Sequence, residues 1–271
     1  MEISLNAVPN KVSNSLRYNK ENSDGSMDVI PTRHPKGKSL QMNKVGKYIY
    51  EKCDGSNSVL NIVESIMRDF NNVSFDVIIT DLFDILFSYW RLGFIDWELN
   101  PYDSFYNHTY KDYQYKILVE DEVSAILNEI ADPNYDFTYS KKYALSETRI
   151  KQSIYLDLEQ YFCVFENNTL KCLVCIKSEN KQKTSADLVV LYLVDDYQNN
   201  IEDVHNFITW SKERFSKLLS KDIIRLNAYL HESNHIANVL DLLGFEKIGE
   251  LKDSILINGE ISSITVKSLK L

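Results

Sequence analysis

The segment Leu188-Val189-Val190-Leu191-Tyr192-Leu193-Val194 is an unbroken run of apolar and aromatic residues that follows Ala186 and Asp187. Short runs of this kind, rich in β-branched residues, are typical of strands that are buried on both faces. We therefore expect residues 186–194 to form a central strand of a sheet whose other members come from the segments on either side.

The neighbouring segments alternate between strand and helix patterns. Before the central strand we expect a strand at 116–119, helices at 121–130 and 146–155, and a hairpin of 161–166 and 170–177 around Asn167-Asn168. After it we expect a helix at 201–219, a strand at 223–230, a helix at 234–243 closed by Gly244, and a hairpin of 247–257 and 261–267. The order β-α-α-β-β-β-α-β-α-β-β predicts an α+β domain over residues 115–271, in which helices cross a mixed sheet.

The N-terminal part of the chain shows a different arrangement. Short strands are predicted at 16–19, 27–31 and 37–42, separated by turn residues. Three helices follow, beginning after Asn43, after Ser56 or Ser58, and after Ser74. Gly93 ends the third helix, and the chain returns as a strand at 94–97. Three strands, three helices and a returning strand predict a winged-helix-like domain over residues 12–97.

Residues 98–114 are polar but rich in tyrosine. A flexible tether contains few aromatic residues. We therefore expect this segment to be a linker that packs on one or both domains.

The composition excludes several classes of function. The chain has 271 residues, enough for two domains, and a formal net charge of −9. That charge disfavours nucleic acids and anionic membranes as partners, because both bind clustered Lys and Arg. We find no signal peptide and no long apolar span, and four cysteines are too few for a disulfide scaffold, so we expect a cytoplasmic protein.

The first domain carries the motifs Leu40-Gln41-Met42-Asn43, Cys53-Asp54-Gly55 followed by Val59, and Leu92-Gly93-Phe94-Ile95. On these residues it resembles the PqqD-like peptide-recognition elements of ribosomally made, post-translationally modified peptides. The resemblance implies that a leader peptide adds as a strand to the edge of the small sheet, beside the third helix. The peptide-binding residues that it implies are Lys38, Ser39, Leu40, Gln41, Met42, Val77, Asp81, Asp84, Phe87, Ser88 and Arg91.

Two other interpretations of the same residues stay open. They can form an ordinary folded interface, or the domain can be a DNA-binding winged helix, which the acidic charge disfavours.

The second domain resembles the GNAT acyltransferase fold. The resemblance is carried by residues 188–194, the long helix after them, and the run from Ser233 to Ala237 that leads to Leu243-Gly244-Phe245. It implies acetyl-CoA or a longer acyl-CoA as cofactor, with the pyrophosphate held by backbone N–H groups after the central strand. The cofactor-binding residues that it implies are Leu193, Val194, Gln198, Asn199, Asn200 and Asn234.

The phosphate loop departs from the pattern of that family, which has small residues where this chain has Ile201 and Asp203. A branched side chain keeps the backbone from approaching phosphate, and Glu202 and Asp203 add like charge. The same two carboxylates would favour the helix dipole with no ligand present. The domain is therefore either an acyltransferase or a GNAT-shaped domain that has lost coenzyme binding.

Candidate catalytic residues lie at the ends of two predicted strands. If the domain is an acyltransferase, the resemblance places Tyr192 near the acceptor site, where it would orient an amine, and His231 or Glu232 would act as a base. The string from His231 to His235 matches the His-Glu-x-x-His pattern of zinc peptidases, but it spans a strand end and a helix start, so we assign no metal site. Cys172 and Cys175 point to opposite faces of one strand and are expected in the core.

We expect a protein that binds the leader of a precursor peptide and N-acylates that peptide from an acyl-CoA. The alternative is a non-catalytic adaptor that presents the precursor to another maturation enzyme.

Overall fold

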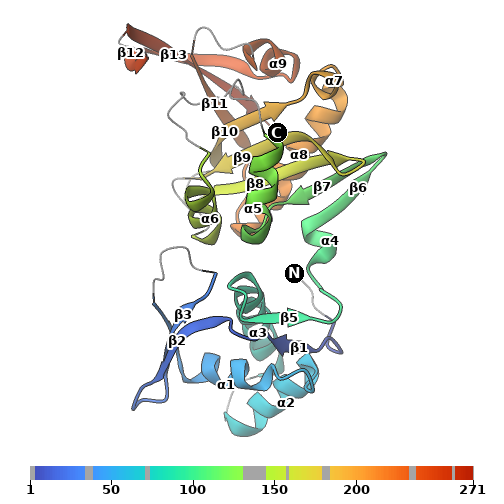
Figure 1. Cartoon of the computed structure of the whole chain (residues 1–271), viewed down its shortest axis with the longest axis vertical. Coiled ribbons are helices and arrows are strands. Elements are labelled where there is room, and N and C mark those ends of the chain that lie inside the picture. Colours follow the sequence, from blue (N-terminus) through green and yellow to red (C-terminus); the bar gives the residue numbers. More distant parts are fainter. Residues whose placement is uncertain are drawn as a thin grey trace. The chain divides into compact units, whose positions relative to one another are not determined.

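The computed structural model describes residues 4–33, 39–70, 74–130, 145–156, 159–178, 184–231, 236–257 and 260–270. Residues 195, 231, 253–257 and 260–262 are described by their main chain alone. The chain divides into two compact units, Met1–Ser104 and Phe105–Leu271. Both contain helices and strands, which confirms a mixed α+β protein (Figure 1).

The N-terminal unit holds the expected strands and helices in the expected order. Its strands are β1 (Pro9–Lys11), β2 (Leu16–Glu21), β3 (Met27–Pro31), β4 (Leu40–Met42) and β5 (Ile95–Trp97). Its helices are α1 (Lys44–Lys52), α2 (Val59–Asp69) and α3 (Phe75–Arg91). The comparison with a winged helix stays an interpretation.

Side-chain caps explain where two of these helices begin. The Asn43 side chain accepts a hydrogen bond from the backbone N–H of Gly46 at 2.7 Å, and Ser58 accepts one from Asn61 at 3.2 Å. Helix α3 ends as expected, because Gly93 adopts a φ of +71°, a conformation that glycine takes without strain.

The first and last strands of the N-terminal unit form a sheet of their own. β5 pairs antiparallel with β1, whereas β2, β3 and β4 make a separate antiparallel sheet in that order. The returning strand therefore does not extend the small sheet. Residues before the predicted boundary at 12 belong to the fold as well, since Ala7 accepts a backbone hydrogen bond from Val59 at 2.9 Å.

The C-terminal unit follows the predicted order of elements, with short additions at its start, before α5 and before α8. Its strands are β6 (Asn107–Tyr110), β7 (Tyr113–Ile117), β8 (Glu159–Glu166), β9 (Thr169–Lys177), β10 (Ser185–Leu193), β11 (Arg225–His231), β12 (Glu246–Ile257) and β13 (Glu260–Lys270). Its helices are α4 (Asp103–Tyr106), which crosses the unit boundary, a 3₁₀ turn at Glu120–Glu122, α5 (Val123–Glu129), α6 (Glu147–Tyr155), α7 (Asp195–Gln198), α8 (Ile201–Leu218) and α9 (Ile236–Leu242).

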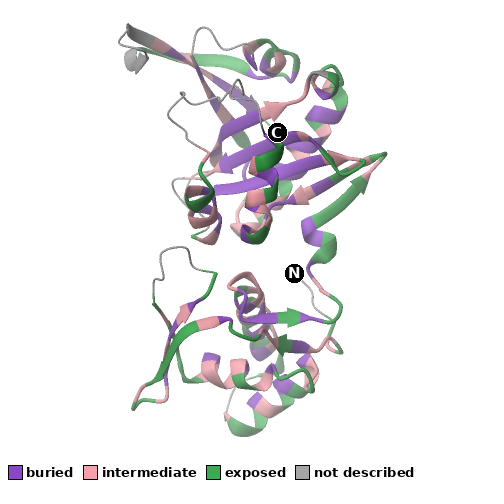
Figure 2. Ribbon diagram, viewed as in Figure 1, coloured by how far each residue is buried: buried purple, intermediate pink, exposed green. Residues whose placement is uncertain are grey.

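These strands form one sheet in the order β12-β13-β11-β10-β9-β8-β7-β6. β10 lies inside it, between β9 and β11, and is mostly buried, as its apolar sequence predicts (Figure 2). The β8–β9 hairpin turns at Asn167 and Asn168, which both have positive φ, as a two-residue turn of this kind requires.

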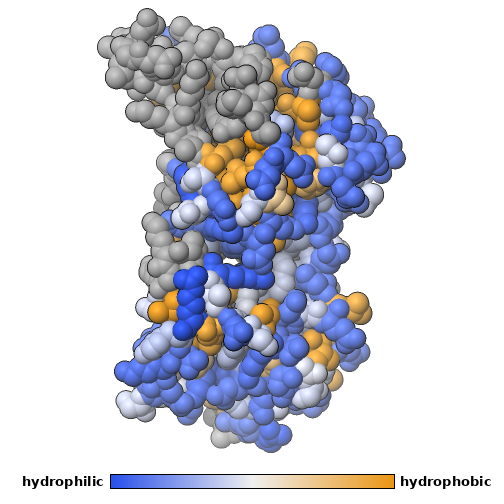
Figure 3. All heavy atoms as spheres, viewed as in Figure 1, coloured by the Kyte–Doolittle hydropathy of each residue, from blue (hydrophilic) through white to orange (hydrophobic). Residues whose placement is uncertain are grey.

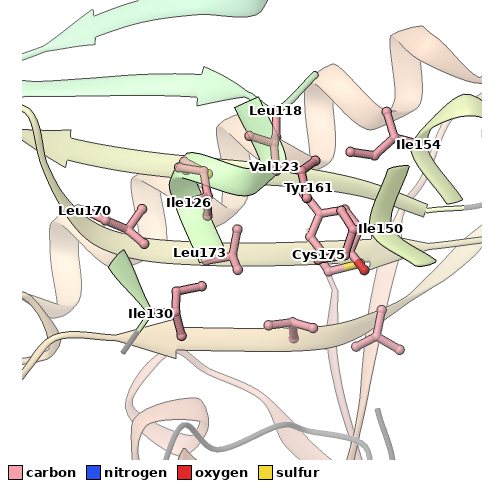
Figure 4. Packing of buried hydrophobic residues seen from close by; sticks show 13 residues of the cluster. Leu118, Val123, Ile126, Ile130, Ile150, Ile154, Tyr161, Leu170, Leu173 and Cys175 are labelled. Atoms are coloured by element: carbon pink, nitrogen blue, oxygen red, sulfur yellow. The ribbon is translucent and has the colours of Figure 1, made fainter. Parts of the chain in front are cut away.

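Helices cover both faces of the sheet. On one face α5 and α6 pack on β8, β9 and β10 through a cluster that includes Val123, Ile150 and Leu173 (Figure 4). On the other face Trp210 of α8 packs edge-on against Phe162 of β8, with ring centroids 5.9 Å apart. Both layers place β10 in the core.

The tyrosine-rich segment at 98–114 is divided between the two units and is not a separate linker. Tyr102 is buried in the N-terminal unit, with its ring centroid 5.1 Å from that of Phe87. Residues 107–110 form β6, the edge strand of the large sheet. The aromatic residues therefore serve as core side chains, which explains their number.

Candidate functional site

The predicted peptide-binding strand is an edge strand. β4 stands at one end of the sheet β2-β3-β4. Its register pairs Leu40 with Val29, Gln41 with Asp28 and Met42 with Met27. The other side of β4 has no strand partner in the part of the chain that the structure describes, and an edge strand is the kind of element to which a further strand can pair. The predicted residue Lys38 lies outside the described residues.

The side chains of this strand divide between the two faces of the small sheet. Met42 is buried, whereas Gln41 and the preceding Ser39 are exposed, and Leu40 is half-buried. Met42 also borders the start of α1, since a Cβ on Gly46 would lie 3.9 Å from the Cβ of Met42. One face of β4 is thus fixed to the core, and among the described residues its outer edge pairs with no strand.

The predicted residues of α3 form an exposed stripe. Val77, Asp81, Asp84 and Ser88 are separated by four, three and four positions, which places them on one side of a helix. All four are exposed, and Val77 retains 50% of its accessible surface. On the face in Figure 3 the N-terminal unit is mostly hydrophilic, with scattered hydrophobic groups.

Phe87 and Arg91 differ from the other predicted residues of α3, because both are half-buried. The Phe87 ring lies 6.1 Å from that of Trp90 and packs edge-on against Tyr102. Phe87 therefore belongs to the aromatic packing of the unit, at the border of the stripe.

In the C-terminal unit, the predicted cofactor-binding residues come together at the end of β10. Leu193 ends β10, Val194 precedes α7, Gln198 ends α7, and Asn199 and Asn200 lead into α8. The sixth predicted residue, Asn234, lies outside the described residues. The predicted segment is therefore a turn between a central strand and a long helix, as the sequence indicates.

A buried carboxylate lies in the first turn of α8. Asp203 is 1% exposed, and its Oδ1 accepts a hydrogen bond from Lys111 Nζ at 2.6 Å. The other carboxylate oxygen accepts a hydrogen bond from the Asn200 side-chain amide. Helix N-termini favour negative charge, so α8 is stabilised here by a group of its own chain.

The hairpin of β6 and β7 also contacts this turn and the start of α8. Besides the Lys111 ammonium, Tyr110 Oη accepts a hydrogen bond from Asn206 at 2.9 Å. The ring of Tyr113 packs edge-on against that of Tyr197 at 5.1 Å. Burial raises the pKa of Tyr197 well above its usual range. The start of α8 is therefore held by the β6–β7 hairpin and by Tyr197 of α7.

These residues do not fit the pyrophosphate of a coenzyme. A phosphate group at a helix N-terminus needs close approach to backbone N–H groups, which small residues allow. Here Ile201 is half-buried at the first helical position, and the Asp203 carboxylate holds the nearby donors. A second anion beside that carboxylate would be repelled.

A second lysine near this turn, Lys171, is also paired with carboxylates. Lys171 Nζ lies 2.6 Å from Asp196 Oδ2 and 3.2 Å from Glu166 Oε2. The hydrogen bond to Asp196, followed by that to Glu166, raises the pKa of Lys171. The lysine is matched by carboxylates of its own unit.

The predicted catalytic residues lie where two parallel strands separate. β10 and β11 pair from Ser185 with Arg225 to Leu188 with Ala228, and the described ladder stops there although both strands continue. Tyr192 and His231 follow on these diverging ends. Tyr192 is half-buried against the cluster under α5 and α6. The His231 side chain and all of Glu232 lie outside what is described.

The described residues contain no group of three or more His, Cys, Asp or Glu side chains that could hold a metal ion. Most of the predicted zinc-peptidase string, Glu232 to His235, lies outside them. Cys172 and Cys175 are both buried in β9, and Cys175 belongs to the cluster under α5 and α6. The register pairs Cys172 with Val164 and Cys175 with Tyr161, which are three positions apart on β8, so the two thiols lie on opposite faces of the sheet.

Sequence reasoning missed Lys111 and Tyr197. Lys111 is 92 positions from Asp203, and nothing local marks their contact. The available signal was the tyrosine-rich segment around Lys111, because its aromatic content indicated packing.

No helix among the described residues is long and apolar enough to cross a membrane. No family model matches the chain, and no curated protein matches it. Several solved structures are similar to about 60% of the chain. One is a ribosomal-protein-S5-alanine acetyltransferase from Vibrio fischeri, with 21% identity over 60% of this chain and 96% of that one, and a TM-score of 0.45.

Two further similar structures are also described as acetyltransferases. A spermidine N-acetyltransferase from Vibrio cholerae is 17% identical over 59% of this chain and 95% of that one, with a TM-score of 0.46. An N-acetyltransferase from Staphylococcus aureus Mu50 is 17% identical over 58% of this chain and 97% of that one, also with a TM-score of 0.46. Likeness at this level assigns neither an activity nor a ligand to the chain.

Proposed function

We propose that this protein binds an extended segment of a precursor peptide with its N-terminal unit and presents the peptide to another maturation enzyme. The peptide pairs as a further strand with β4, and its side chains contact the exposed stripe of α3. Main-chain pairing supplies affinity, and the side chains of the stripe supply selectivity.

One observation carries this proposal. β4 has a strand partner on one side only among the described residues, and its Met42 is anchored in the core. An edge strand held in this way is a fixed template, so little ordering of the protein is needed when a peptide binds.

The chemistry of the stripe indicates what kind of peptide binds. Asp81 and Asp84 are exposed carboxylates, and Val77 is an exposed apolar side chain. A segment with a Lys or Arg near an apolar residue matches both. An affinity near micromolar, about −8 kcal/mol, is sufficient for a docking step.

The proposal is tested by selecting short random peptides on the full chain and measuring their affinity for variants. Asp81→Lys and Asp84→Lys are each expected to weaken binding about three- to tenfold, because they replace attraction by repulsion. Glu64→Lys is the matched control, since Glu64 is an exposed carboxylate on α2. Equal losses in all three variants, or no peptide recovered, would count against the proposal.

A second candidate function is transfer of an acyl group to the bound peptide. The end of the β10–β11 pairing at Leu188 and Ala228 favours it, because Tyr192, the candidate for orienting an acceptor amine, follows on β10 directly after this point. The first turn of α8 opposes it, because Ile201 and the buried Asp203 carboxylate do not fit the phosphate of an acyl-CoA. We therefore infer that the protein binds the peptide without transferring an acyl group to it.

The two candidates are separated by incubating the full chain with a selected peptide and acetyl-CoA and recording the mass of the peptide. An unchanged mass is expected. A mass increase of one acetyl group that requires the intact Asp81 stripe would establish the second candidate instead.

A further inference from the structure

The carboxylate of Asp203 is surrounded by the groups that usually bind an external anion. A lysine ammonium and an asparagine amide donate hydrogen bonds to it, and it lies in the first turn of an 18-residue helix. Ammonium groups, amide donors and helix N-termini are all features that hold phosphate in proteins. In this chain they bind a side chain.

The carboxylate is also sealed from water by its own unit. Asp203 is 1% exposed, whereas its neighbour Glu202 is exposed. The Tyr197 hydroxyl donates to the Asp203 backbone carbonyl at 3.3 Å, and Tyr197 is buried. The two acidic residues of this turn therefore differ. The Asp203 carboxylate is buried and hydrogen-bonded within its own unit, whereas the Glu202 side chain is exposed.

The main source of positive charge comes from a distant part of the sequence. Lys111 has a φ of +53° at the turn between β6 and β7, and its side chain keeps half of its accessible surface. Its hydrogen bond to Asp203 is the largest cause of a raised Lys111 pKa. The ammonium is thus charged at neutral pH and partly reachable from solution.

We infer that Asp203 is a built-in anion that fills a phosphate-binding position formed by Lys111, Asn200 and the first turn of α8. The natural chain therefore takes up no phosphate group at this turn. Removing the carboxylate exposes a site for inorganic phosphate or for the phosphate of a nucleotide. This inference concerns the C-terminal unit and does not depend on peptide binding by the N-terminal unit.

Anion rescue tests the inference. Asp203→Ala removes the carboxylate and keeps a good helix-forming residue. Inorganic phosphate at tens of millimolar, compared with chloride at equal ionic strength, is expected to raise the melting temperature of this variant by about 3 °C. The natural chain and Glu202→Ala are expected to respond to both salts alike, and a second substitution, Lys111→Ala, to abolish the rescue.

Coenzyme A serves as a second probe in the same assay, and it separates free phosphate from a nucleotide as the source of the phosphate group. Stabilisation of Asp203→Ala by inorganic phosphate alone identifies a small anion site, and stabilisation by both identifies one that is open to nucleotides. Either result supports the inference. Equal stabilisation of the natural chain and the variant by phosphate, or none in either, overturns it.

A measurement on the natural chain covers the case in which Asp203→Ala does not fold. The line width of inorganic phosphate is followed by phosphorus NMR as protein is added. No broadening beyond that of Lys111→Ala is expected. Broadening that Lys111→Ala removes would mean that the turn already binds phosphate, and the inference would be overturned.

Discussion

The ammonium of Lys111 lies 2.6 Å from the carboxylate of Asp203, across 92 positions of sequence. This pair joins the β6–β7 hairpin at one edge of the large sheet to the first turn of α8. It ties the β6–β7 part of the tyrosine-rich segment to α8 of the C-terminal unit, and it places a charged group of the chain where a coenzyme phosphate was expected.

Breaking this pair is expected to destabilise the C-terminal unit. Lys111→Met leaves a buried carboxylate with fewer donors and is expected to lower the free energy of unfolding, an effect that solvent screening of the half-exposed lysine keeps modest. Urea unfolding of Lys111→Met, Asp203→Asn and the double variant measures the coupling. Strictly additive losses would show that the two side chains do not stabilise each other.

Asp54 is expected to give the N-terminal unit a stability that depends on pH. Hydrogen bonds from Ser56, above all from its side chain, lower the Asp54 pKa to about 2. A depressed pKa in the folded state contributes stability above the ordinary value of 3.8, and that contribution is lost as the pH falls toward 2.

The unfolding midpoints of the natural chain and Asp54→Asn should therefore differ above pH 4 and converge below it. A difference that stays constant across this range would contradict the assignment of the hydrogen-bonded turn.

Gly46 is expected to resist substitution although it lies in a helix. A Cβ at this position would lie 2.7 Å from Tyr89 Oη, and Tyr89 is buried. Gly46→Ala should therefore lower the free energy of unfolding by about 1 kcal/mol, despite the better helix propensity of alanine. Gly249→Ala is the control, because a Cβ there meets nothing within 4 Å. Thermal unfolding is measured for both variants, and only Gly46→Ala is expected to lower the melting temperature.

The four cysteines are expected to be unreactive in the folded protein. All are free and buried, and burial raises the pKa of Cys53 to about 12 and that of Cys172 well above its ordinary value. Since the thiolate is the reactive form, thiol reagents at pH 8 should label all four only after unfolding. Rapid labelling of Cys172 in the native state would contradict its placement under α8.

Local patterns predicted most elements of the fold. Asn43 and Ser58 begin helices as caps, and Gly93 ends α3 with positive φ. These features depend on hydrogen bonds within a few residues, so they can be read from the sequence. The burial of β10 followed in the same way from its unbroken apolar run.

Contacts between distant segments could not be predicted in this way. β5 pairs with β1 from the far end of its unit, and Lys111 contacts Asp203 across 92 positions of sequence. No local period encodes either contact. The sequence did indicate that Ile201 and Asp203 are unsuited to phosphate, but not that Asp203 is buried and paired.

Hydrogen exchange of the β4 amides tests the central claim most directly. The exchange of residues 40–42 is recorded in the full chain, alone and with a peptide selected from a random library. Pairing of the peptide with β4 should slow the exchange of the backbone amides at these residues and at the residues of the exposed stripe of α3. Unchanged exchange at β4, with a peptide that binds elsewhere on the chain, would contradict the account.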